Sequence, residues 1–147
     1  MSRVKKFEPA GGPGRLANRR GAEAKLEVEA LLRRAGYQVG RRVPIGGSIY
    51  GTKLFADLLV RDSRRWPDGL IIEVVSQESH GSADQKFPYL VENIRACHPV
   101  PTVVVLIGCG FRGKALDWLH GQVDDRKLLA VVPLDRFEEW VAQSLAG

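Results

Sequence analysis

The sequence is poor in the features that build thiolate, membrane and nucleotide-loop sites. Its two cysteines, Cys97 and Cys109, lie twelve positions apart without a CxxC pair, which argues against a zinc site and predicts free thiols. The three histidines lack metal-ligand spacing, and Gly108-Cys109-Gly110 completes neither a GxGxxG nor a Walker pattern. No apolar run approaches membrane-spanning length, and no signal-peptide core follows the first residues. We therefore expect a cytoplasmic protein.

Charge is present but unevenly distributed. The 147 residues carry a net charge of +5, with 44% hydrophobic and 27% charged residues, as in a globular protein of one domain. The excess of Lys and Arg falls within the first 42 residues. A clustered basic surface suits a polyanionic partner, although a solvated helix face is the alternative. The candidates for nucleic-acid contacts are Arg15, Arg19, Arg20, Arg41, Arg42 and Lys53.

The N-terminal residues divide into two parts by composition. Residues 1–17 are rich in Gly and Pro without apolar periodicity, which predicts a flexible basic arm, and we expect residues 18–147 to form a single α/β domain. Apolar spacing predicts a first helix over residues 18–35. Glu27 lies at the border of its apolar stripe, where it either pairs with nearby arginines in solvent or leans toward the core.

Short apolar runs predict the rest of the domain. We expect strands over residues 37–43, 54–60, 70–76, 101–107 and 128–132. Pro44 should end the first of them, because proline interrupts a strand. Helical patterns lie near residues 82–97, 114–120 and 135–145. Since the run 101–107 is apolar at both parities, it is the best candidate for the central strand. The order predicts a mixed sheet of four to five strands flanked by helices.

Two acids interrupt otherwise apolar strands. Asp57 lies within the run 54–60 and Glu73 within the run 70–76, and a hairpin between these strands would bring the two together. A buried unpaired carboxylate costs several kcal/mol, so these positions require partners. Two converging carboxylates suit a hard divalent cation; the alternative is a structural network with Arg or Lys.

The ordered set of these residues resembles the PD-(D/E)XK nuclease superfamily, which has a restriction-endonuclease-like fold. The similarity covers roughly residues 18–110: a helix with an acid, Asp57, Ile72-Glu73, Ser76-Gln77 and the segment 81–89, GSADQKFPY. It implies a DNA endonuclease that hydrolyses phosphodiester bonds with Mg²⁺, or Mn²⁺ as a substitute. Asp57, Glu73 and the backbone carbonyl of Val74 would bind the metal, with Glu27 as the helix acid. A homodimer is expected, because one compact domain cuts one strand at a time.

Val75 departs from the pattern, because the superfamily signature places a lysine there. That lysine orients the attacking water and stabilises developing negative charge, which a valine cannot do. Lys86 is the first candidate for a replacement and Gln77 the second, while Lys53 is more distant along its strand. The alternative function is a catalytically inactive, nuclease-like subunit that binds nucleic acid or serves in assembly.

Overall fold

Ten segments of regular structure form the fold. In the computed structural model they are α1 (Pro13–Arg34), β1 (Val39–Gly47), β2 (Lys53–Val60), β3 (Leu70–Ser76), α2 (Ser82–Ala96), β4 (Thr102–Ile107), α3 (Gly113–His120), β5 (Leu128–Pro133), α4 (Leu134–Trp140) and a π-helical turn, η1 (Val141–Leu145). The structure describes residues 13–76, 82–108 and 113–145, with side chains from residue 21 onward in α1 and from residue 84 onward in α2. Within these parts no helix is both long enough and apolar enough to cross a bilayer.

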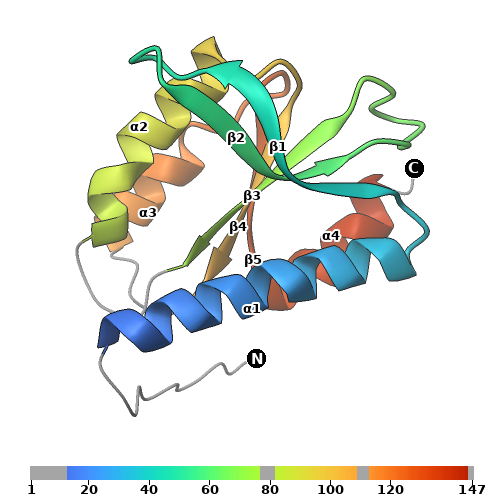
Figure 1. Ribbon diagram of the computed structural model, residues 1–147, viewed down its shortest axis with the longest axis horizontal. Coiled ribbons are helices and arrows are strands. Elements are labelled where there is room, and N and C mark those ends of the chain that lie inside the picture. Colours follow the sequence, from blue (N-terminus) through green and yellow to red (C-terminus); the bar gives the residue numbers. More distant parts are fainter. Residues whose placement is uncertain (1–12, 77–81, 109–112, 146–147) are drawn as a thin grey trace.

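The five strands form one mixed sheet in the order β1-β2-β3-β4-β5. Strand β2 runs antiparallel to both β1 and β3, and β3, β4 and β5 run parallel. Helix α1 crosses one face together with α4, while α2 and α3 cover the other (Figure 1). The predicted α/β, restriction-endonuclease-like architecture is confirmed. The central strand is β3, however, and not the strand at 102–107, because β5 adds beside β4.

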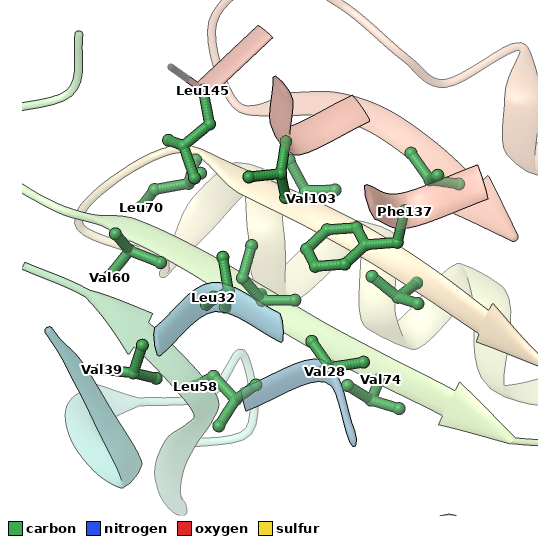
Figure 2. Close-up of a cluster of buried hydrophobic side chains, with 14 of the residues drawn as sticks. Val28, Leu32, Val39, Leu58, Val60, Leu70, Val74, Val103, Phe137 and Leu145 are labelled. Atoms are coloured by element: carbon green, nitrogen blue, oxygen red, sulfur yellow. The ribbon is translucent and has the colours of Figure 1, made fainter. Parts of the chain in front are cut away.

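Two apolar clusters hold the helices on the sheet. Val28 and Leu32 of α1 pack with Val74 of β3 and Phe137 of α4 on the first face (Figure 2). On the second face, the cluster consists of Phe87, Val91, Ile94, Val104, Leu106, Leu119, Leu128 and Val131. Side chains alternate along a strand, so β3 and β4 contribute apolar residues to both clusters.

Prolines account for two differences between the predicted and observed elements. Helix α1 begins at Pro13 rather than at residue 18, because the fixed φ of proline suits a first helical turn. Residues 1–12 of the predicted arm lie outside the described residues. Strand β1 continues through Pro44, which an edge strand tolerates, with an irregular register between Pro44 and Gly46. Pro88 lies inside α2, which begins at Ser82.

The turn between β1 and β2 is fixed to α2. The buried Asn93 accepts a hydrogen bond through Oδ1 from the backbone N–H of Ile49, at 2.9 Å. Tyr50 stacks on Tyr89 of α2 with ring centroids 5.2 Å apart. These contacts hold the far end of the hairpin, and with it the beginning of β2.

Candidate active site

Asp57 and Glu73 lie at the point where the β2–β3 ladder ends. Leu58 pairs with Ile72, so the next positions, Asp57 and Glu73, are opposite each other. There Oδ2 of Asp57 accepts a hydrogen bond from the backbone N–H of Val74 at 2.9 Å. The carboxylate of Asp57 therefore replaces a backbone acceptor, and the strands open around the two acids.

The carboxyl of Glu73 lies in an environment that disfavours its charge. Its Oε2 is buried without a hydrogen-bond partner. Burial, and next the neighbouring charge of Asp57, raise the pKa of Glu73 well above its usual value, although a backbone hydrogen bond with Asp57 and the charge of Lys25 act in the opposite direction. A cation between these two carboxyl groups would satisfy the buried oxygen and remove their repulsion.

Lys25 of α1 also lies at the site, although it was not among the residues predicted from the sequence. Its Nζ lies 3.1 Å from Oδ1 of Asp57, and its side chain is 46% exposed. Ala24 and Val28, on either side of it in the chain, belong to the buried stripe of the helix. Helical periodicity alone gave a weak signal that position 25 borders this stripe, but no signal that it faces Asp57.

The acid that α1 buries is Glu29 rather than Glu27. Glu29 is 4% exposed and accepts hydrogen bonds from Nε of Arg33 at 2.8 Å and Nε of Arg41 at 2.6 Å. Burial raises the pKa of Glu29, but these two guanidinium groups outweigh it and hold the pKa below its usual value. Glu27 is exposed, and at 3.6 residues per turn it lies about 160° around the helix from Lys25.

A groove of about 550 Å³ opens beside Asp57 between α1 and the β1–β2 hairpin. Its walls are formed by Ala22, Lys25, Leu26, Glu29, Arg41, Arg42, Phe55, Asp57 and Leu58. Three of these side chains are cationic. Against the two acids of the lining, Glu29 and Asp57, they give the groove a positive balance of charge beside Asp57.

Arg42 of β1 lies opposite Asp57 of β2, since Arg41 pairs with Leu58 and Val43 pairs with Ala56. Its φ of 45° lies in the left-handed region, where residues other than glycine are uncommon and strained. The guanidinium carbon of Arg42 is 4.2 Å from the centroid of the Phe55 ring. This cation–π contact keeps a positive charge at the groove.

The other predicted site residues are distributed as follows. The backbone of Val74 presents its N–H to Asp57, and in a strand the C=O of the same residue points to the same edge. Val75 packs against the second apolar cluster. Lys86 is exposed on α2, and Lys53 is exposed where β2 begins. Gln77 and the side chains of Arg15, Arg19 and Arg20 lie outside the described residues.

The donor set fits a hard cation with few protein ligands. In the described segments, no group of three or more His, Cys, Asp and Glu side chains is arranged to hold a metal ion. Two carboxylates and a backbone carbonyl are oxygen donors. Mg²⁺ keeps several waters and binds through one or two carboxylates together with phosphate oxygens, so the residues present suit it.

Comparison with known proteins gives one match. A family model described as a PD-(D/E)XK nuclease superfamily domain matches residues 16–145. No curated protein and no solved structure gives a significant match. The matched segment includes α1, all five strands and both acids.

Proposed function

The chain belongs to the PD-(D/E)XK nuclease superfamily, and from this membership we propose that it is a metal-dependent endonuclease that hydrolyses phosphodiester bonds in DNA. The observation that carries the proposal is the buried, unpartnered Oε2 of Glu73 beside the carboxylate of Asp57. A structural ion-pair network would leave no such oxygen. Burial and the charge of Asp57 raise the pKa of Glu73 at the open end of the ladder, and a cation bound by both acids would offset both effects.

Asp57, Glu73 and the backbone carbonyl of Val74 are the proposed ligands, with Mg²⁺ as the metal and Mn²⁺ as a substitute. When bound, the metal neutralises charge on the phosphate and makes a coordinated water more acidic. The protein contributes the placement of these oxygens. The Val74 N–H fixes the rotation of the Asp57 carboxylate, and the second cluster, on which Val75 packs, holds β3.

The basic groove is the proposed path of the nucleic acid. Arg41 and Arg42 of β1 line the groove beside Asp57. Lys53 is exposed at the start of β2, the strand that carries Asp57. Arg15, Arg19 and Arg20 would extend this positive surface along α1. Contacts of this kind are made to phosphates and carry no sequence information, so binding should weaken steeply with salt and depend little on sequence.

The second candidate function is a nuclease-like subunit that binds nucleic acid, or serves in assembly, without cutting. It is favoured by one observation, the packing of Val75 against the apolar cluster of α2 and α3 at the signature position for lysine. Lys86 and Gln77 remain the candidates from the sequence for that missing group. The two functions differ in the outcome of one assay.

Plasmid nicking with Mg²⁺ or Mn²⁺ tests the proposal. We expect Asp57→Asn and Glu73→Gln each to lower the cleavage rate at least about 100-fold, because each removes an anionic metal ligand. In Asp57→Asn the new amide oxygen would still accept the hydrogen bond from the Val74 N–H, so the fold should persist. The matched controls are Asp125→Asn and Glu92→Gln, two exposed acids away from the site, which should cut like the wild type.

Each outcome of this assay has a defined meaning. Loss of cleavage with retained DNA binding in both site variants supports the metal-dependent nuclease. Wild-type protein that binds DNA but nicks nothing with either metal supports the inactive subunit. Site variants that cut as fast as the wild type would show that the reaction takes place elsewhere.

A further inference from the structure

The site contains a lysine, although not the one that the superfamily signature specifies. Nζ of Lys25 lies 3.1 Å from Oδ1 of Asp57, while Oδ2 of the same carboxylate is occupied by the backbone N–H of Val74. We propose that Lys25, from helix α1, is the catalytic residue that supplies the positive charge for which Val75 is unsuited. This inference rests on the proposed nuclease function.

The backbone of α1 is held firmly against the strands that carry the acids. Val28 and Leu32 are fully buried in the first cluster, and Ala24 is 4% exposed. At Gly21 the helix passes so close to the end of β3 that a Cβ there would lie 3.4 Å from Oγ of Ser76. The Cα of Lys25, one turn further along, therefore has a fixed distance to Asp57.

The side chain of Lys25, by contrast, is free to move. Nearly half of it is exposed, and it lines the groove next to Asp57. A cation that binds Oδ1 would displace the ammonium group from that oxygen. Four methylene groups then allow the ammonium to turn into the groove, where a phosphate oxygen and the attacking water would lie.

The other cations of the groove are already engaged. Nε of Arg41 is bonded to the buried Glu29, and the guanidinium of Arg42 lies on the ring of Phe55. Lys86, which does not line the groove, is exposed on α2. The contacts of the described residues thus bring Lys25, rather than these three, to the carboxylate of Asp57.

The reaction requires no proton transfer through Lys25. The oxygen of water forms a new bond to phosphorus, the bond from phosphorus to the leaving sugar oxygen breaks, the water gives a proton to solvent, and the leaving oxygen takes one from solvent. Lys25 remains an ammonium group throughout. Its N–H groups hold the water and stabilise the negative charge that grows on the phosphate oxygens, the work assigned to the signature lysine.

A counter-ion that only neutralises Asp57 in the metal-free protein would give different kinetics. Single-turnover cleavage at saturating Mg²⁺, with Mg²⁺ affinity measured by calorimetry, separates the two. We expect Lys25→Met to cut about 100-fold more slowly than the wild type, since loss of one transition-state donor costs about that factor. Its Mg²⁺ affinity should be equal or higher, because a competing cation is gone. Lys114→Met, at an exposed lysine of α3, is the matched control.

Chemical rescue adds a measurement that a structural role would not affect. Propylammonium should restore cleavage to Lys25→Ala, because it replaces the deleted methylene groups and ammonium. Tetramethylammonium at the same concentration has the charge but no N–H donor and should not. Cleavage by Lys25→Met within about twofold of the wild type, or a loss of cleavage that follows a loss of Mg²⁺ binding, would overturn the proposal.

One further variant, Lys86→Met, separates this inference from the proposed function. If Lys86→Met loses cleavage while Lys25→Met keeps it, the charge comes from α2 and Lys25 has no catalytic role. In this case the wild type still cuts, so only the assignment of Lys25 fails. If the wild type does not cut with Mg²⁺ or Mn²⁺, the proposed function fails, and the assignment fails with it.

Discussion

At the scale of single residues, the site is defined by three side chains that differ in burial and in hydrogen-bond partners. Glu73 has a buried oxygen without a partner, Asp57 shares its two oxygens between the Val74 N–H and Lys25, and Lys25 has a half-exposed stem. The environment of Glu73 is costly without a ligand. This cost is consistent with a site that is completed when a cation binds.

The raised pKa of Glu73 predicts how the metal-free protein responds to pH. A carboxyl group whose pKa is higher in the folded than in the unfolded state stabilises the fold at low pH, and that stabilisation is lost as the pH rises through the folded-state pKa. We therefore expect Glu73→Gln to melt at a higher temperature than the wild type at pH 8 without metal. The difference should be about 3 °C or more, the shift that 1 kcal/mol produces in a domain of this size.

Thermal melting at pH 5 and pH 8, with and without Mg²⁺, measures this effect. Mg²⁺ should raise the melting temperature of the wild type more at pH 8, where Glu73 loses its proton more readily, and should leave Glu73→Gln nearly unchanged. Glu92→Gln provides the comparison for an exposed acid. Equal melting curves for wild type and Glu73→Gln at both pH values would show that Glu73 is not destabilised by its surroundings.

At the scale of elements, the position of α1 determines which of its side chains reach the sheet. The helix buries Val28 and Leu32, so that Lys25 and Glu29 lie toward the β1–β2 hairpin and Glu27 lies away from it. Gly21 sets the closest approach of this helix to β3. The same docking therefore produces both the groove and the contact between Lys25 and Asp57.

Gly21 gives a prediction about this docking. Alanine is more favourable than glycine inside a helix by about 1 kcal/mol, and its Cβ would meet Ser76 near ordinary contact distance. We expect Gly21→Ala to increase the free energy of unfolding by up to about 1 kcal/mol in urea titrations, with cleavage unchanged. Ala22→Gly, at the next and exposed position, should lower it by about the same amount. A destabilised Gly21→Ala would mean that α1 cannot yield even a few tenths of an ångström at Ser76.

At the scale of the whole molecule, charge and symmetry bear on the substrate. The first 42 residues carry the excess of positive charge, and Lys25, Arg41 and Arg42 place part of it in the groove between α1 and β1, while the rest of the chain is slightly acidic. The basic surface and the two carboxyl groups are therefore neighbours. An anionic substrate would be drawn toward this side of the molecule.

We propose that the protein acts as a homodimer, because the described part of each chain brings together a single pair of site acids, Asp57 and Glu73, and duplex DNA has two strands. Light scattering after size exclusion should give about twice the mass of the single chain. Supercoiled plasmid should then become linear with little accumulation of nicked circles. A monomer at all concentrations, producing only nicked circles, would contradict the proposal and would leave the metal site unaffected.

The sequence by itself determined the local structure and the two acids. Apolar runs placed all five strands, since burial on one or both faces of a sheet leaves a pattern that neighbouring residues carry. Asp57 and Glu73 stood out because a charged residue in such a run requires a partner. The bounds of two elements were less clear from the sequence. Strand Val39–Gly47 continues through Pro44, which an edge strand tolerates, and the first helix begins at Pro13.

Only the tertiary structure decided what surrounds those acids. Lys25, rather than Glu27, faces the strands because of how α1 is rotated and docked, and that rotation depends on packing against residues of β3 and α4 that are distant in sequence. The central position of β3 likewise depends on where β5 is added. Local patterns specify which side chains are buried, but contacts between elements specify which charge meets which, and so they brought a lysine of the first helix to the end of the β2–β3 ladder.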